Sequence, residues 1–322
     1  MTKESLRIVY MGTPDFAVET LDRLVSGGYN VVGVVTMPDK PVGRHQTTLQ
    51  ASPVKRYALE HGLPLLQPER LRDEAFLQAL ADMRPDLGVV VAFRMLPEVV
   101  WAMPRLGTFN LHAALLPQYR GAAPINWAII NGDTETGVTT FFLDHDIDTG
   151  RVIHRRSVPI ADTDTAEDVH DRLMHLGADL VCATIDDIIA DRVTPIPQDQ
   201  LTTDGPLRPA PKLFKDNCRI TWTDGTKRCY DFIRGLSPYP AAWTTLVDEG
   251  GKAVVMKIYV AHKDFSPVAE APGTVLVADG EMRIVLADGT LVIDSLQMAG
   301  KKRMATADFL RGFHPQGLLH VE

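Results

Sequence analysis

The sequence predicts an α/β domain with a doubly wound, mostly parallel sheet, followed by a small β-barrel domain. Three observations support this prediction. The first part of the chain alternates short Val-rich runs with helical patterns, which is typical of parallel strands covered on both faces. Residues 193–211 then form a proline-rich connector without periodicity. Beyond it, short alternating segments are separated by Asp-Gly and Gly-Gly turns, which indicates a barrel.

The elements of the first domain follow from apolar runs, helical periodicity and breaks at glycine or proline. Strands are predicted at residues 6–11, 31–35, 63–66, 87–93, 108–112 and 137–143. Helices are predicted at residues 15–26, 53–61, 73–83 and 166–190. Ligands of a doubly wound sheet bind beyond the carboxyl ends of the strands, so the turns after these strands are where a site is expected.

The elements of the second domain are shorter and mostly extended. A helix is predicted at residues 226–234, and a final helix at 306–312 begins with Thr306 as a plausible cap. Strands are predicted at residues 242–247, 253–260, 273–277, 282–286 and 291–297.

Composition narrows the classes of protein. The chain has 322 residues, 45% hydrophobic and 23% charged, which suits two folded domains and excludes a disordered chain. The formal net charge is −8, which argues against a surface covered with nucleic-acid contacts. The balance is uneven, because residues 1–207 carry 18 Lys and Arg against 28 Asp and Glu, whereas residues 208–322 carry 15 against 13.

Cysteine usage and the N-terminus indicate a cellular location. Cys182, Cys218 and Cys229 form no CxxC pair, which argues against a disulfide framework or a zinc ribbon and suits a reducing compartment. No signal-peptide core follows the N-terminus, and no apolar run approaches the length of a membrane span. We therefore expect a cytoplasmic protein without a membrane partner.

Two motifs that resemble binding loops are rejected. The turn at Gly12 follows a strand and precedes a helix, but it matches neither GxGxxG nor GxxxxGK[ST]. Residues 144–150 begin like a calcium loop, yet Thr149 and Arg155 stand where that loop needs Gly and Glu. Zinc has no HExxH or cysteine cluster in its favour, so no metal is expected.

The strongest signal lies at the end of the strand at 108–112. Asn110 and His112 are two residues apart, so they face the same side of this strand. An acidic loop containing Asp148 ends the next strand. A capping asparagine and an ordinary hydrogen-bonded histidine would explain each residue alone. An amide donor, an imidazole and a carboxylate at neighbouring strand ends instead predict an acyl-transfer site.

These residues resemble the signature of the 10-formyltetrahydrofolate-dependent formyltransferases, in which Asn-x-His precedes a Leu-Leu-Pro loop and Asp-Thr-Gly. Further segments resemble the branch of that family that formylates methionyl-tRNA. They are residues 11–17 (MGTPDFA), 38–44 (PDKPVGR), 52–55 (SPVK), 103–107 (MPRLG), 119–125 (YRGAAPI), 219–222 (RITW) and 238–243 (PYPAAW).

The resemblance implies a Rossmann-like catalytic domain at residues 1–191, a linker at 192–211 and an OB-like, tRNA-binding barrel at 212–322. It implies formyl transfer from 10-formyltetrahydrofolate to the α-amine of methionyl-initiator tRNA, without a metal and without a protein partner. The catalytic residues it implies are Asn110, His112 and Asp148. The folate-binding residues are Phe93, Ala114, Leu115, Leu116, Pro117 and Asp144. The residues for the aminoacyl end and the tRNA are Gly12, Thr13, Pro14, Phe16, Arg44 and Lys212.

Four positions depart from the family pattern. Ala114 replaces the usual Ser, which removes a hydroxyl. Residues 92–97 (AFRMLP) are one residue shorter than usual, which changes the expected pterin pocket. Asp146 stands where Gly is common, and Asp tolerates a left-handed backbone better than most residues. The loop around Arg44 is less basic than its Lys-rich counterparts.

Other functions remain as alternatives. A formyltransferase for a small amine, such as glycinamide ribonucleotide or an amino-sugar nucleotide, would share the catalytic half but would not need a basic barrel. A catalytically silent nucleic-acid-binding protein would not need Asn110, His112 and Asp148. A nicotinamide oxidoreductase lacks its glycine fingerprint here.

Overall fold

The computed structural model describes residues 1–42, 48–203, 205–313 and 317–322. The chain divides into two compact units. The first unit contains Met1–Gly121, Gly137–Val158 and His170–Pro209, and the second contains Ala122–Thr136, Pro159–Val169 and Ala210–Glu322. Two segments from the first part of the sequence are therefore packed with the C-terminal part.

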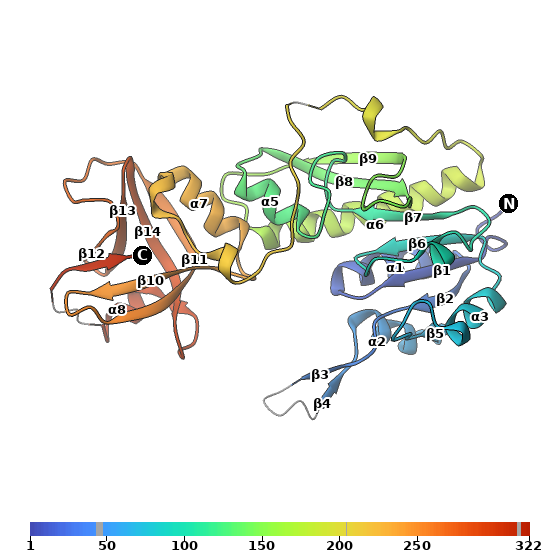
Figure 1. Cartoon of the computed structure of the whole chain (residues 1–322), viewed down its shortest axis with the longest axis horizontal. Coiled ribbons are helices and arrows are strands. Elements are labelled where there is room, and N and C mark those ends of the chain that lie inside the picture. Colours follow the sequence, from blue (N-terminus) through green and yellow to red (C-terminus); the bar gives the residue numbers. More distant parts are fainter. Residues whose placement is uncertain (43–47, 204, 314–316) are drawn as a thin grey trace. The chain divides into compact units, whose positions relative to one another are not determined.

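The first unit is built on a seven-stranded sheet (Figure 1). In spatial order its strands are β5 (Leu65–Leu66), β2 (Val31–Val35), β1 (Ile8–Gly12), β6 (Leu87–Val91), β7 (Thr108–His112), β8 (Glu135–Phe142) and β9 (Val152–Pro159). Neighbours from β5 to β7 pair in parallel, and β7 pairs with β8 antiparallel. The predicted, mostly parallel sheet is confirmed. β1 and β6 are buried along their whole length, which explains their continuous apolar runs.

Helices cover both faces of this sheet, as a doubly wound fold requires. On one face, α1 (Asp15–Ser26) receives the hydroxyl of Tyr10, and α6 (Ala166–Ile189) brings Gly177 against Leu111. On the other face, Phe76 and Leu80 of α3 (Glu74–Asp82) pack with Val9 of β1 in one apolar cluster. Helix α2 (Pro53–Glu60) begins at Ser52, whose hydroxyl accepts a hydrogen bond from the amide of Lys55.

Several elements were not predicted from the sequence. They are the hairpin of β3 (Lys40–Val42) and β4 (Thr48–Gln50), the edge strand β9, and the short helices α4 (Glu98–Trp101) and α5 (Pro124–Ile130). Strand β9 is half exposed and carries His154 and two arginines, so it lacks the apolar pattern of a buried strand. Helices α4 and α5 are too short to show helical periodicity.

The second unit contains a closed barrel of strands β10 (Ala242–Asp248), β11 (Ala253–Asp264), β12 (Thr274–Ala278), β13 (Glu281–Leu286), β14 (Gly289–Met298) and β16 (Leu319–Val321), with β15 (Met304–Ala305) attached to β14. Pairing of β11 with β14 closes the ring. The predicted barrel is confirmed, but β16 was missed. It lies between β10 and β12, and its partners are distant in sequence. Alternate residues such as Met256, Ile258 and Ile284 fill the core.

Short helices surround the barrel. Helix α7 (Thr226–Gly235) begins where Asp288 accepts hydrogen bonds from the amide and hydroxyl of Thr226. Helix α8 (Thr306–Leu310) ends earlier than expected, and the predicted cap at Thr306 is wrong, because Ala305 holds the cap position and Thr306 is the first helical residue. Among the described residues, none of the helices combines the length and the apolar character needed to cross a bilayer.

Candidate functional site

The structure brings His112 and Asp148 together. His112 is the last residue of β7 and is 6% exposed. Its Nδ1 lies 3.8 Å from a carboxylate oxygen of Asp148, which follows β8 in the loop before β9. Its Nε2 lies 2.8 Å from the carbonyl oxygen of Tyr119. The imidazole is therefore held on one side by the backbone and faces a carboxylate on the other.

Asn110 occupies the same face of β7 as His112, because side chains alternate along a strand. It is half-buried, whereas its neighbours Phe109 and Leu111 are buried in the core. Within the described part of the chain, its side-chain amide makes no hydrogen bond, so both its donor and its acceptor are available to a bound molecule.

The Asp148 loop has a defined backbone. Asp148 adopts the left-handed conformation with φ of 56°, and its carboxylate accepts a hydrogen bond of 2.9 Å from the amide of Gly121. The residue with the left-handed conformation is thus Asp148. Asp146, which stands where Gly is common in the family, does not have a positive φ. Gly150 ends the loop because a Cβ there would lie 1.7 Å from the carbonyl oxygen of Phe142. The loop can turn back into β9 only with glycine at this position.

The loop at residues 114–117, which is predicted to bind folate, is held in place by Thr139 of β8. Thr139 donates to the carbonyl of Ala114 and accepts from the amide of Leu116, at 2.6 and 3.1 Å. Leu116 packs with Phe141 and Val152, and Ala114 and Pro117 are also buried. Leu115 is half-buried. The side chains of Ala114 and Leu116 therefore support the loop, and their contact with folate stays a prediction.

A second apolar surface is formed by residues that follow β6, by helix α4 and by the residue that follows β8. Phe93, Trp101 and Leu143 are partly buried against the cluster that contains Leu96 and Val100. Asp144, also predicted to contact folate, is exposed and accepts a hydrogen bond from the amide of His145. Phe93 follows β6 at the edge of the sheet where His112 ends β7. Asp144 follows β8 at the opposite edge, because β8 runs antiparallel to β7 and its last residues pair with the start of β7.

Arg94 holds the shortened loop after β6. Its guanidinium donates to the backbone carbonyl of Glu69, at 2.9 Å, and to that of Pro68. Burial lowers the pKa of Arg94, although a guanidinium remains charged at neutral pH. Arg94 therefore anchors this shortened loop to the segment after β5.

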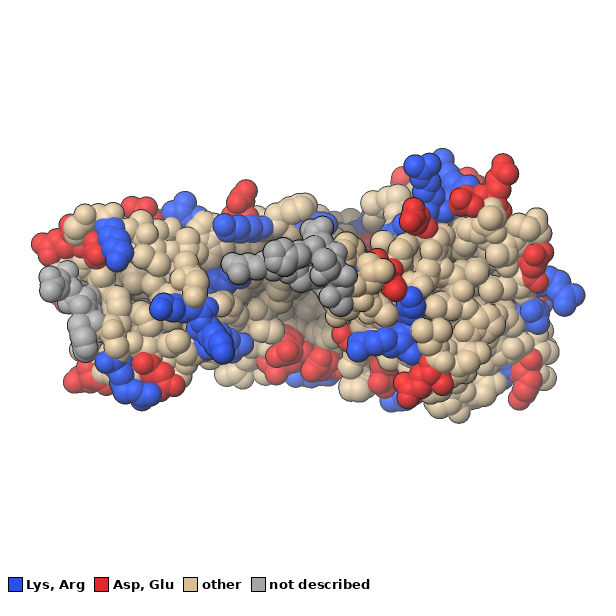
Figure 2. Space-filling view, turned by 90° about the horizontal axis from the view of Figure 1, so that it is seen from below, with Lys and Arg blue, Asp and Glu red and all other residues tan. Residues whose placement is uncertain are grey.

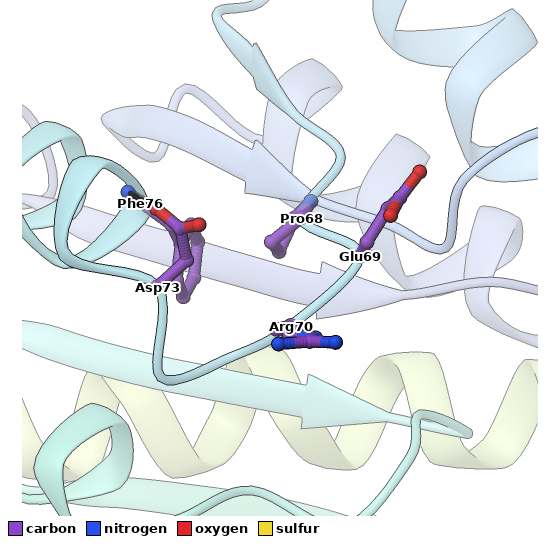
Figure 3. A pocket seen from close by; sticks show the side chains of 5 residues that line it. All are labelled: Pro68, Glu69, Arg70, Asp73 and Phe76. Carbon is purple, nitrogen blue, oxygen red and sulfur yellow. Dashed lines mark hydrogen bonds between the residues drawn. The ribbon is translucent and has the colours of Figure 1, made fainter.

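That neighbouring segment lines a pocket of about 410 Å³ (Figure 3). Its lining residues are Pro68, Glu69, Arg70, Asp73 and Phe76. Two carboxylates and one guanidinium give it no single charge preference. None of the residues predicted to bind substrate or folate lines this pocket, although Phe76 of its lining packs in the same apolar cluster as Phe93.

The turn after β1 was predicted to receive the aminoacyl end. Gly12 has a packing reason of its own, since a Cβ there would lie 2.7 Å from the Cβ of Ala17. Pro14 precedes the first residue of α1, and Phe16 is buried against the ring of His170. The hydroxyl oxygen of Thr13 is buried and has no hydrogen-bond partner among the described residues. Contact of this turn with the aminoacyl end stays a prediction.

Of the two residues predicted to contact tRNA, the structure describes only Lys212. Arg44 lies outside the described residues, although β3 and β4 on either side of it pair as a hairpin. The base of that hairpin is held by Asp39, which accepts from Lys55 at 2.7 Å and from Gln67 at 3.0 Å. Lys212 is exposed in the second unit, with its ammonium group 5.4 Å from the centre of the Phe214 ring.

Sequence reasoning missed one buried residue beside the trio. Gln198 lies in the short 3-10 helix Gln198–Gln200 and donates to backbone carbonyls of the Asp148 loop. It stands in the proline-rich connector, where nothing in the local pattern marks it as buried. No group of three or more His, Cys, Asp or Glu that could hold a metal ion occurs in the described ranges.

Comparison with known proteins agrees with this architecture. Residues 6–185 match the family described as formyl transferase, and residues 212–314 match the formyl transferase C-terminal domain. The methionyl-tRNA formyltransferase of Bacteroides fragilis is 64% identical over 98% of this chain and 97% of its own length. That of Porphyromonas gingivalis is 47% identical, with complete coverage of both chains.

Solved structures show the same fold at low identity. HypX from Aquifex aeolicus, in complex with tetrahydrofolic acid, has a TM-score of 0.64 at 18% identity and covers 97% of this chain and 49% of its own. The sugar 3N-formyl transferase WlaRD has a TM-score of 0.63 at 19% identity and covers 92% of this chain and 99% of its own. The two matched domains and the full-length similarity to close relatives show that this chain belongs to the methionyl-tRNA formyltransferase family.

Proposed function

We propose that Asn110, His112 and Asp148 are the catalytic group with which this formyltransferase passes the formyl group of 10-formyltetrahydrofolate to the α-amine of methionyl-initiator tRNA. The observation that carries the proposal is the 3.8 Å separation of His112 Nδ1 and Asp148, beside an Asn110 amide without a partner in the described chain. Two polar groups on β7 and one in the loop between β8 and β9 supply what acyl transfer to an amine requires.

Each residue has a role that follows from its geometry. The amine nitrogen attacks the formyl carbon and forms a tetrahedral intermediate, whose oxyanion accepts a hydrogen bond from the Asn110 amide. The attacking nitrogen then loses a proton, and N10 of the folate gains one as its bond to the formyl carbon breaks. His112 Nδ1 is the nitrogen available for this transfer, because Nε2 is bonded to Tyr119. The Asp148 carboxylate stabilises positive charge that develops on the imidazole.

The apolar surface proposed for the folate lies on the face of the sheet that carries Asn110 and His112, because its cluster includes Val90, the register partner of Asn110. The apolar surface of Phe93, Trp101 and Leu143 suits the flat pterin ring, and the loop at residues 114–117 suits the adjoining part of the folate. The turn around Thr13 lies at the end of β1, and we assign the methionyl end to it.

The second unit carries cations and aromatic rings that suit contacts with RNA. Lys215 and Arg219 lie 5.8 and 5.6 Å from the centre of the Trp243 ring, and Phe214 beside Lys212 is 61% exposed. Cations neutralise phosphates, and exposed rings stack on bases. Figure 2 shows Lys and Arg interspersed with Asp and Glu over one face, so RNA binding would depend on this local cluster more than on overall charge.

These assignments imply a division of labour along the chain. Residues 1–191 would form the catalytic domain, 192–211 a linker and 212–322 the tRNA-binding barrel, with Arg44 contributing from the hairpin region. Aminoacylated initiator tRNA and folate as substrates suit a reaction in the cytoplasm. The free thiols of the three cysteines are compatible with that compartment.

Direct assay of acceptors tests the proposed substrate. Transfer from 10-formyltetrahydrofolate would be measured with methionyl-initiator tRNA, methionyl-elongator tRNA, free methionine and an amino-sugar nucleotide. We expect transfer to the initiator tRNA at a far higher kcat/KM than to the other acceptors. Preference for a small amine would favour the alternative and would leave the cations around Trp243 without a substrate role.

A further inference from the structure

Gln198 is a buried amide with all of its main hydrogen-bonding directions in use. It is 5% exposed, although glutamine is mostly found at protein surfaces. Its Nε2 donates to the carbonyl oxygens of Asp148 and Gly150, both at 2.8 Å. Its Oε1 accepts from Nε and Nη2 of Arg120, at 3.0 and 2.7 Å. One side chain therefore joins two loops that are distant in sequence.

Those two loops are the ones that hold the catalytic pair. Arg120 stands between Tyr119, whose carbonyl accepts from His112, and Gly121, whose amide donates to the Asp148 carboxylate. The hydrogen bonds of Gln198 therefore complete a network that links His112, residues 119–121 and Asp148. In this network, the distance between His112 and Asp148 depends on the relative position of the two loops.

This hydrogen-bond network restrains the backbone of Asp148. A left-handed φ of 56° costs free energy for a residue with a side chain, so surrounding contacts must hold it. The side-chain amide of Gln198 donates to the carbonyl oxygens of Asp148 and Gly150, the residues on either side of Thr149. Without them, the loop keeps the bond from Gly121 to the Asp148 side chain and the bond from Thr149 to Asp146.

We propose that Gln198 is a positioning residue for formyl transfer, which sets the orientation of the Asp148 carboxylate toward His112 through the backbone of the Asp148 loop. The inference rests on the catalytic role proposed for Asp148. Gln198 does not act on the substrates itself. Its removal should therefore lower kcat and leave the KM values for both substrates nearly unchanged.

Two substitutions separate this role from simple support of the connector. Gln198→Met keeps the length of the side chain but removes all four bonds. Gln198→Glu keeps an acceptor for Arg120 but loses the donor to the two carbonyls. We expect both variants to lose roughly tenfold to a hundredfold in kcat, the range typical of residues that orient catalytic groups. Gln200→Met, in the same turn but exposed, is the matched control and should keep wild-type activity.

A double-mutant cycle with Asp148→Asn completes the test. If Gln198 acts through Asp148, Gln198→Met should cost less than about twofold in kcat once Asp148 is already Asn. Equal losses in both backgrounds, a full-activity Gln198→Glu variant, or a raised KM with unchanged kcat would each overturn the proposal. Circular dichroism and melting temperature confirm that each variant is folded at the assay temperature.

The cycle also distinguishes the two levels of inference. An inactive Asp148→Asn variant with a fully active Gln198→Met variant would refute only the role of Gln198. A fully active Asp148→Asn variant would overturn the role of Asp148 and the positioning role with it.

Discussion

Nε2 of His112 lies 2.8 Å from the carbonyl oxygen of Tyr119, so this nitrogen carries a hydrogen and donates it. In the neutral ring, Nδ1 is then the unprotonated nitrogen, and it faces Asp148. The backbone of one loop thereby selects the tautomer of the histidine, and we propose Nδ1 as the nitrogen that takes part in proton transfer.

This assignment predicts an order of activities among variants of His112. The amide of Asn superimposes approximately on Nδ1 of histidine, whereas that of Gln superimposes on Nε2. We expect His112→Asn to retain more kcat than His112→Gln, with both at least about a hundredfold below wild type. Steady-state kinetics with methionyl-tRNA measures the order. The reverse order would assign the reaction to Nε2.

Asn110 and Asp148 should be needed for turnover and dispensable for folding. Asn110→Ala is expected to lose about a hundredfold to a thousandfold in kcat, the typical cost of an oxyanion donor. Asp148→Asn removes the charge but preserves an acceptor for Gly121, so its melting temperature should stay near that of wild type. Asp146→Asn, exposed in the same loop, is the control and should remain active. Nearly full activity of either site variant would remove that residue from the catalytic group.

Arg94 should affect folate binding and not the chemical step. Arg94→Ala releases the loop after β6 from the carbonyls of Pro68 and Glu69, so the apolar surface at Phe93 loses its support. We expect KM for 10-formyltetrahydrofolate to rise roughly tenfold or more, which corresponds to about 1.4 kcal/mol, with kcat at saturation largely preserved. Arg70→Ala, which changes the pocket of Figure 3 instead, should leave KM unchanged. An equal effect of both variants would place folate in that pocket.

The cluster of Lys212, Lys215, Arg219 and Trp243 should govern tRNA use. Replacing Lys215 or Arg219 by Ala is expected to raise KM for methionyl-tRNA. The slope of log KM against log salt should fall by about one for each phosphate that the variant no longer neutralises. Lys252→Ala, an exposed lysine elsewhere on the barrel, serves as the control. Arg44→Ala should act in the same way as the cluster variants. Folate affinity measured in the same salt series should not change. If the variants show the salt dependence of the wild type, the cations of the cluster are solvated surface charges without a role in tRNA binding.

Catalysis should be independent of metal ions. The formyl donor is already activated, and the described residues offer no cluster of His, Cys, Asp or Glu suited to bind an ion. We expect exhaustive chelation followed by dialysis to leave kcat unchanged within error. A large loss that added zinc restores would contradict this prediction.

Local features of the chain accounted for much of the fold. The apolar runs of β1 and β6 and the start of α2 at Pro53 depend on neighbours in sequence, so their positions could be predicted. The shared face of Asn110 and His112 followed from the two-residue period of a strand. Strands β9 and β16 could not be found in this way, because one is a polar edge and the other pairs only with distant partners.

By itself, the sequence determined the layers of the sheet, the existence of the barrel and the residue types available for acyl transfer. Only the tertiary structure decided that Nδ1 of His112 faces Asp148, that Asp148 takes the left-handed conformation, and that Gln198 joins their loops. The reason is physical. Apolar periodicity reports which side of an element is buried, whereas a hydrogen bond between loops depends on how independently folded segments meet in space.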